Sequence, residues 1–501
     1  MTSRTNSRTP SRTPRASPLA SPKTTAVTSL AGWTALVLAP ADAARMQSAT
    51  PAVLHAVAGV PMVRLACDLL RDAGCEHIVV VAGAERAALA AVIGDGSESG
   101  PEAGIEIVDA QDADGSAHAA LRARAAAGER RNVLILRADM PLLSARTLRE
   151  LAGRHLGESR VLTILTAYLT DPHGFGRILR RNGEVQGIVG ERDLTAAMRG
   201  QPEVNAGLYA VDAAWLWETL AALLPKQGQP NAHPDALGEL VAHAVQHGGV
   251  EAYQVAEAIE VAQVGDRLQL AQADQILRDR IRDRLMHEGV TLMDPPSIYI
   301  DSGVRVAADT VILPGTHLTG ATTIGSGCRI GPNAMLHDMA VGERCEIGGS
   351  TLEGSTVGDG VTVGPYCHVR PGSTLERDVH LGNYAEVKAS RIGARTAVGH
   401  FSYIGDADVG TDVNVGAGSI TANYDGVLKH RTVIGDGVHL GSDTIMVAPV
   451  TLGRGARTGA GAVVVDDVPE GATVVGVPAR IRAPRAGTDG ADATTEGGHL
   501  A

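Results

Sequence analysis

The chain has 501 residues, which is too long for one compact core, so two or three domains are expected. Its formal net charge of -12 argues against a nucleic-acid partner, so any anion site must be a local cluster of arginine and lysine. No apolar run reaches the length of a membrane span. Only 3% of the residues are aromatic while 60 are glycine, a combination typical of a solenoid with tight corners and a narrow core.

Residues 1–30 combine Arg, Ser, Thr and Pro with no acidic residue, and they predict a disordered tail. The run that follows, AVTSLAGWTALVLAPADAA, imitates the apolar region and cleavage site of a secretory signal peptide. The alternative is that Ala35 to Leu38 forms the first strand of an α/β domain. The elements that follow this run favour the strand.

Residues 31–265 alternate between short apolar strands and helical segments. A helix is predicted at VRLACDLLRDAG, and strands at HIVVVAG, NVLILRAD, VLTILTAYL and VNAGLYAVD. This alternation predicts a mostly parallel sheet with helices on both faces. Residues 266–290 then predict a linker helix.

Residues 291–482 carry aliphatic side chains at a period of six. The clearest series is Val363, Val369, Leu375, Leu381 and Val387. The period also runs through Val306, Ile312, Leu318, Ile324 and Ile330, and through Ile434, Leu440, Met446, Leu452, Thr458 and Val464. Period six fits neither a helix nor a flat strand, and it predicts a left-handed parallel β-helix. The stretch VNVGAGSITANYDG from Val413 is expected to interrupt it, and residues 483–501 predict a second disordered tail.

The five cysteines have no CxxC spacing and are odd in number. They are Cys67, Cys75, Cys328, Cys345 and Cys367. This pattern predicts reduced, buried thiols and a cytoplasmic location.

Motifs in both halves carry a family resemblance. In the second half they are RPG at Arg370, GNYAEVKAS at Gly382, GHFSYIGDADVG at Gly399, VNVGAGSITANYDG at Val413 and GSDTIMVAP at Gly441. Looser matches in the first half are LVLAP, RM, GVPMV, ADMPLL, GFGRI and VNAGLYAV. The chain resembles the bifunctional N-acetylglucosamine-1-phosphate uridyltransferase/glucosamine-1-phosphate N-acetyltransferase family of bacterial cell-wall precursor synthesis. This implies an α/β Rossmann-like nucleotidyltransferase domain followed by a left-handed hexapeptide-repeat β-helix, small-molecule substrates and a homotrimer.

The second half contains the groups that acetyl transfer to a sugar amine requires. His400 is the candidate general base, because an ordinary histidine titrates near working pH. Arg370 and Lys388 are candidates for binding the sugar phosphate. Glu386 could orient the histidine or the sugar. A lone histidine on a solenoid face is more often a solvated surface residue, but here the charges and His400 lie within five matching motifs.

The resemblance adds further site residues. It implies sugar contacts from Tyr403 and Asn414, and a contact from Lys429 that reaches over the site from a neighbouring subunit. For acetyl-CoA, the co-substrate, it implies Ala417, Asn423, Tyr424, Ser442 and Ala460.

The first half departs from the family's glycine-rich nucleotide loop, which commonly reads LAAGxGTRM. This chain reads LAPADAARM, in which Pro40 removes a backbone donor and Asp42 places a negative charge beside a triphosphate. Alanines replace two of the family's glycines, at Ala41 and Ala43. Arg45 is retained, but the expected lysine after Pro51 is Ala52.

Further departures concern the metal, the sugar and the base. Asp139 matches a magnesium ligand but its partner asparagine is Gly265, which makes magnesium binding weak. The sugar-facing glutamate aligns with Gly190 and the uracil-side glutamine with Ala110, although Gln111 adjoins it. Retained positions are Gly115, Ser116, Gly176 and Asn205. The sequence therefore predicts a working acetyltransferase with an impaired or inactive uridyltransferase domain. The alternatives are a fully bifunctional enzyme and a binding protein that senses UDP-sugars.

Overall fold

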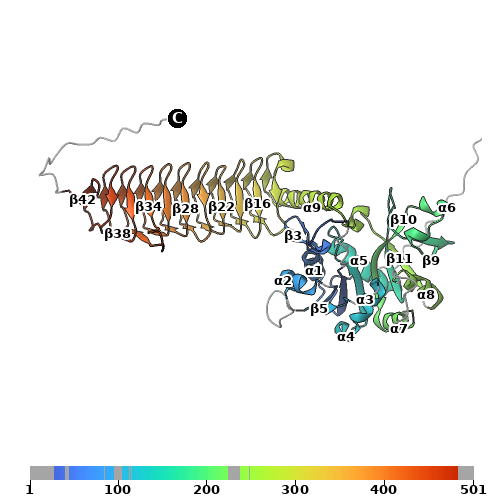
Figure 1. The fold of residues 1–501 in the computed structure, drawn as a ribbon. Coiled ribbons are helices and arrows are strands. Elements are labelled where there is room, and N and C mark those ends of the chain that lie inside the picture. The colour runs from blue at the N-terminus through green and yellow to red at the C-terminus, as the bar shows by residue number, and fades with distance from the viewer. Residues whose placement is uncertain are drawn as a thin grey trace, which may run out of the picture. The chain divides into compact units, whose positions relative to one another are not determined.

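A computed structural model describes residues 27–39, 45–83, 85–94, 104–111, 113, 115–158, 160–223, 237–247 and 249–482 (Figure 1). The chain forms two compact units. Unit 1 comprises the described parts of Met1–Ala56 and Pro61–Ala273, and unit 2 those of Val57–Val60 and Asp274–Ala501. The predicted tail 483–501 and residues 1–26 of the other tail lie outside the described residues. Leu30 is fully buried in the core of unit 1, so the packed chain begins before residue 31.

Unit 1 is built on a mostly parallel sheet with the strand order β11-β7-β10-β6-β1-β4-β5. Only β10 on this path is antiparallel to its neighbours. A β8–β9 hairpin pairs with β10. The strands are β1 (Trp33–Leu38), β4 (His77–Ala82), β5 (Ile105–Asp109), β6 (Asn132–Arg137), β7 (Leu162–Tyr168), β8 (Arg177–Arg181), β9 (Glu184–Val189), β10 (Glu203–Asp212) and β11 (Val250–Gln254).

Helices cover both faces of this sheet. Alternate residues of β1 point to opposite faces, so Ala35 and Val37 join one apolar core while Leu36 and Leu38 join the other. The first core includes α1 (Met62–Asp72), α2 (Arg86–Ile93) and α5 (Ala145–Glu158). The second includes α3 (Ser116–Arg122), α4 (Arg124–Ala127), α7 (Ala213–Leu223) and α8 (Glu239–His247). A short helix, α6 (Ala196–Arg199), follows the β8–β9 hairpin. Within the run that imitated a signal peptide, Trp33–Leu38 thus forms a buried central strand.

Unit 2 is a left-handed parallel β-helix with three faces. Its first sheet contains β12 (Thr291–Leu292), β15 (Val311–Ile312), β18 (Arg329–Ile330), β21 (Glu346–Ile347), β24 (Thr362–Val363), β27 (His380–Leu381), β30 (Ala397–Val398), β33 (Asn414–Val415), β36 (His439–Leu440), β39 (Arg457–Thr458), β41 (Thr473–Val475) and β42 (Arg480–Ile481). As far as β39, every third strand returns to the same sheet, as the hexapeptide period requires.

The other two faces follow the same rule. The second sheet contains β13 (Tyr299–Ile300), β16 (His317–Thr319), β19 (Met335–His337), β22 (Thr351–Glu353), β25 (His368–Val369), β28 (Glu386–Lys388), β31 (Tyr403–Gly405), β34 (Ile420–Ala422), β37 (Ile445–Val447) and β40 (Val463–Val464). The third contains β14 (Arg305–Val306), β17 (Thr323–Ile324), β20 (Ala340–Val341), β23 (Thr356–Val357), β26 (Thr374–Leu375), β29 (Arg391–Ile392), β32 (Ala407–Val409), β35 (Thr432–Ile434) and β38 (Val450–Leu452).

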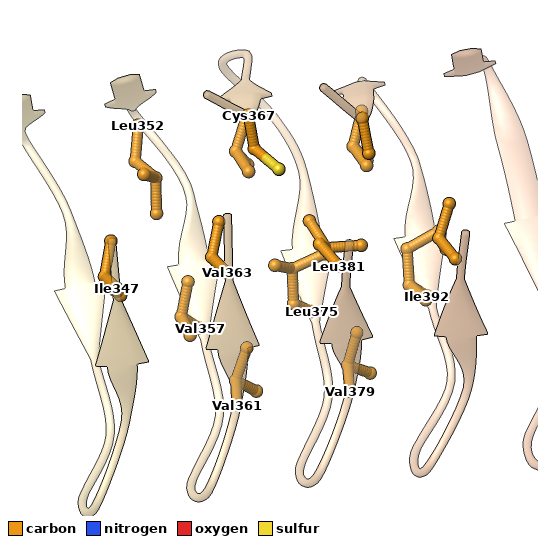
Figure 2. Close-up of a cluster of buried hydrophobic side chains, with 14 of the residues drawn as sticks. Ile347, Leu352, Val357, Val361, Val363, Cys367, Leu375, Val379, Leu381 and Ile392 are labelled. Carbon is orange, nitrogen blue, oxygen red and sulfur yellow. The ribbon is translucent and has the colours of Figure 1, made fainter. Parts of the chain in front are cut away.

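One aliphatic side chain per strand fills the core of the β-helix. Figure 2 shows Val363, Leu375 and Leu381 among the side chains that gather between the strands, and all three are buried. Cys367 lies in the same core, and all five cysteines are free and buried, as predicted. The period of six therefore arises because each face contributes one inward position per coil.

A loop at 423–431 interrupts the coils. The interruption was expected from Val413, but β33 and β34 still pair in register with their neighbours, so it begins only at Asn423. Arg391 and Asp408 on neighbouring coils are 17 residues apart, whereas Thr411 and Asp436, on either side of the loop, are 25 apart. Within the loop, the backbone N–H groups of Val427 and Leu428 donate to Asp425 and lower the pKa of its carboxyl group.

A long helix and a hairpin complete the base of unit 2. Helix α9 (Arg267–His287) contributes Ile281 and Leu285 to the β-helix core. The hairpin formed by β2 (Ala56–Val57) and β3 (Val60–Pro61) has its turn in unit 2, and we call residues 57–60 the base hairpin. Within the described chain, no helix is both long enough and apolar enough to cross a membrane.

Two carboxylates hold the base hairpin. The Ala58 N–H donates to Asp274 Oδ1 at 2.7 Å, and Arg278 pairs with both Asp274 and Asp301. Gly59 has a φ of +80°, and a side chain there would collide with the Asp301 carboxylate. Glycine is therefore required at this turn for both conformation and space.

Candidate functional site

The predicted phosphate ligands lie on neighbouring coils of the second sheet. Glu386 and Lys388 are the first and last residues of β28, and Arg370 directly follows β25. Parallel pairing sets Glu386 beside Tyr403 of β31. Arg370 Nη1 lies 3.1 Å from Glu386 Oε1, so this carboxylate is placed to orient the arginine.

A second carboxylate, Asp406, organises the lysine side of this group. Lys388 Nζ lies 3.4 Å from Asp406 Oδ2, and both side chains are less than one-fifth exposed. Asn423 Nδ2 donates to the same carboxylate oxygen and to the Tyr403 hydroxyl. Asp406 was not among the predicted site residues. In a sequence, an aspartate at a turn is explained equally well by turn conformation as by a role in a site.

Lys429 approaches this cation group from the 423–431 loop of the same chain. The contact with Lys388 lowers the pKa of the Lys429 ammonium group, and the positive charge of Arg370 acts in the same direction. Arg370, Lys388 and Lys429 therefore lie together with two carboxylates, and the excess of positive charge attracts an anion such as a phosphate monoester.

His400 lies at a corner, just before β31, with an exposed side chain. Its Nδ1 makes a short hydrogen bond with Asn383 Oδ1. An amide oxygen only accepts, so Nδ1 carries the proton and the lone pair of Nε2 is available to a substrate. The sequence prediction missed Asn383, although it lies inside the GNYAEVKAS motif.

Three of the five residues expected at acetyl-CoA form a column with His400. Backbone hydrogen bonds connect this corner from coil to coil, from Gly418 to His400, from Asp443 to Ala417 and from Gly461 to Ser442. The glycines just before these positions let the coils approach closely, since a side chain at Gly416 or Gly441 would meet the next backbone. Ala417, Ser442 and Ala460 therefore continue upward from His400 along one edge.

The structure does not bring every predicted residue together within one chain. Asn414 begins β33 in the first sheet, around the corner from Lys388 and Tyr403. Among the described residues, no hydrogen bond or ion pair connects His400 to Arg370, Lys388 or Lys429. Tyr424 lies in the loop, where its hydroxyl donates to Gly426 O at 2.6 Å.

In unit 1, Asp139 is held by an arginine. Arg137 Nε donates to Asp139 Oδ1 at 3.0 Å and Arg137 Nη2 to Oδ2 at 2.5 Å, and the carboxylate is almost fully buried. The Arg45 guanidinium fills the space that a side chain at Gly265 would need. Magnesium prefers an octahedral set of oxygen ligands. A carboxylate engaged by arginine and a glycine covered by arginine do not fit that ion.

The other retained positions of unit 1 are placed as follows. The Asn205 N–H donates to Gly176 O at 2.9 Å, and Asn205 Nδ2 donates to the Tyr209 hydroxyl at 2.7 Å. Gly115 precedes α3 with a φ of +91°, and Ser116 begins that helix. Ala110 is buried and Gln111 exposed. Gly190 precedes a 3-10 turn, Glu191–Asp193, and Ala52 begins another, Ala52–Leu54. The replaced loop positions Pro40, Ala41, Asp42 and Ala43 lie outside the described residues.

Comparison with known proteins places both halves in transferase families. The MobA-like NTP transferase domain matches residues 35–285. The bacterial transferase hexapeptide (six repeats) matches residues 354–389, and the hexapeptide repeat of succinyl-transferase matches residues 431–465. The chain is therefore an enzyme of the transferase class, with a nucleotidyltransferase-like unit and a hexapeptide-repeat unit.

Relatives along almost the whole chain share one name, bifunctional protein GlmU. The relative from Heliobacterium modesticaldum is 42% identical over 445 residues, covering 88% of this chain and 95% of its own. Those from Trichlorobacter lovleyi and Mycolicibacterium vanbaalenii are also 42% identical, covering 87% and 88% of this chain and 94% and 89% of their own. With this identity over this length, the chain belongs to the bifunctional uridyltransferase and acetyltransferase family of the proteins called GlmU.

Proposed function

We propose that unit 2 transfers the acetyl group of acetyl-CoA to the amino group of glucosamine-1-phosphate, and that unit 1 has lost full uridyltransferase activity. The grouping of Arg370 and Lys388 with Lys429 of the 423–431 loop supports the first part, because a phosphate monoester requires such a group of cations. The five free, buried thiols are compatible with a reducing, cytosolic location for this reaction.

His400 is the proton acceptor in this proposal. With Nδ1 donating to Asn383, the Nε2 lone pair removes a proton from the sugar ammonium group. The neutral amine then attacks the thioester carbonyl, so that the C–N bond forms and the C–S bond breaks, and the second proton lost by the nitrogen neutralises the departing thiolate of coenzyme A. The corner column of Ala417, Ser442 and Ala460 gives the coenzyme a path that ends at His400.

A complete site on this proposal needs more than one chain. His400 and Asn414 lie apart from the cation group of their own chain, and one face of a prism is too open to exclude water. A homotrimer with cyclic symmetry would set the corner column of one subunit against the second sheet of the next. Site completion between subunits therefore supports the trimer as part of the proposal.

Two assays on the purified chain test the proposal. We expect acetyl-CoA to be consumed when glucosamine-1-phosphate is added, measured as free coenzyme A thiol. We expect pyrophosphate release from UTP and N-acetylglucosamine-1-phosphate to stay near background with magnesium present, because Arg137 engages the Asp139 carboxylate and Gly265 supplies no ligand. Robust magnesium-dependent pyrophosphate release would contradict the loss of uridyl transfer, and no thiol release would contradict the acetyltransferase.

Asn383 gives a second test because it acts only through His400. We expect Asn383→Leu to lower kcat by about tenfold, the scale of one lost hydrogen bond of this kind, with the KM for both substrates almost unchanged. Asn383→Gln should recover part of the loss because it keeps an amide oxygen. A substrate-contact role would instead raise KM, and steady-state kinetics with each substrate varied distinguishes the two.

A further inference from the structure

Two guanidinium groups stand at the carboxyl end of the sheet in unit 1. Arg137 is the last residue of β6, and its guanidinium covers both oxygens of Asp139 while keeping 35% of its side chain exposed. The Val264 N–H donates to the backbone oxygen of Asp139 at 2.9 Å, and the Arg45 guanidinium packs against Gly265, the residue after Val264. We call Arg45, Arg137 and Asp139 the guanidinium cluster.

The cluster has unsatisfied positive charge. Arg45 has no carboxylate or hydrogen-bond acceptor among the described residues, and its side chain is exposed. The cluster therefore offers an incoming phosphate N–H donors where a metal site would offer a cation.

The cluster also lies where a parallel sheet binds ligands. Ligands of open α/β sheets occupy the carboxyl ends of the strands, and β1, β4, β5 and β6 all end at this edge. Ser116, which follows β5, has a buried Oγ with no partner among the described residues. A hydroxyl that is buried and unpaired in the free protein is suited to a hydrogen bond with a ligand.

We propose that the guanidinium cluster replaces magnesium, so that unit 1 binds a phosphate-bearing nucleotide without any divalent cation. This deepens the proposed loss of uridyl transfer: the unit keeps charge for binding a diphosphate but has no metal to activate a triphosphate. Arg45 and Arg137 contact the phosphate oxygens, and Ser116 Oγ bonds to the nucleoside.

Calorimetric titration of the full chain with UDP-N-acetylglucosamine tests this inference. We expect the same Kd, within about twofold, in EDTA and in magnesium chloride. The reason is that the diphosphate is bound by arginine side chains, which EDTA does not remove. Arg137→Ala and Arg45→Ala should each weaken binding about tenfold or more. Arg146→Ala, which removes an exposed arginine from α5 of the same unit, is the matched control and should bind as the parent does.

Asp139→Asn distinguishes a guanidinium cluster from a metal site, because the two predict opposite changes in the affinity for UDP-N-acetylglucosamine. If Asp139 held magnesium, losing its charge would weaken binding. In the guanidinium cluster the same change releases Arg137 from this carboxylate and removes a negative charge, so we expect binding to strengthen about threefold or more. Magnesium-dependent binding, weakening by Asp139→Asn, or no binding by the parent chain would each overturn the inference. Pyrophosphate release measured on the same samples reports the proposed loss of uridyl transfer separately.

Discussion

Replacing His400 by alanine should lower the kcat of acetyl transfer by about 10²–10⁴-fold, the range that a general base contributes. The reason is that the ammonium group of the sugar must lose a proton before it can attack, and Nε2 of His400 is the lone pair that the hydrogen bond to Asn383 leaves available. Release of the coenzyme A thiol under saturating substrates measures the effect.

The control for this variant is a second exposed histidine on the same β-helix. His439 begins β36 in the first sheet, and His439→Ala should acetylate at the parent rate. The thermal unfolding midpoint of His400→Ala should match the parent, because an exposed corner side chain contributes little to the core. If His400→Ala acetylated the sugar at the parent rate, His400 would not be the general base.

Replacing Lys388 by alanine should raise the KM for glucosamine-1-phosphate by about 10–100-fold, with a smaller change in kcat. A charge-assisted hydrogen bond to a phosphate contributes about 1.5–3 kcal/mol, and the variant also leaves the Asp406 carboxylate facing the phosphate without its lysine. Initial rates over a range of sugar-phosphate concentrations measure the change.

A second substitution separates lost attraction from new repulsion. Lys388→Ala combined with Asp406→Asn removes the unpaired carboxylate, so its KM should fall partway back toward that of the parent. Arg391→Ala, on the third sheet, removes an exposed arginine paired with Glu376 and Asp408 and serves as the matched control. An unchanged KM in Lys388→Ala would refute the phosphate contact.

The architecture of both units was predictable from the sequence because each depends on a repeated geometry. The period of six fixes which aliphatic residues face the core, and Val363 and Leu381 lie there as expected. Alternation of strands and helices likewise predicted the sheet of unit 1. The start of the interrupting loop was placed too early, since β33 and β34 retain their pairing through a sequence that merely looks irregular.

The polar partners of the two sites were less predictable. Arg370 and Lys388 were expected from chemistry and motif, and Lys429 from the family resemblance as a contact from a neighbouring subunit. Asp406 and Asn383 were not expected, because aspartate and asparagine are common at turns for conformational reasons. Arg137 was missed for a related reason. An arginine at the end of a predicted strand is usually a surface charge. Only the fold shows that Arg137 pairs with the Asp139 carboxylate.

The base hairpin affects how the two halves of this enzyme can be separated. Residues 57–60 occur early in the chain yet pack in the β-helix core, where Ala58 is fully buried and hydrogen-bonds to Asp274. A β-helix expressed from residue 274 onward would lack the base hairpin. Asp274 and Asp301 would then lose the backbone of residues 57–60 that packs against them. An autonomous acetyltransferase half would therefore need those few residues supplied in trans, or grafted onto the start of α9.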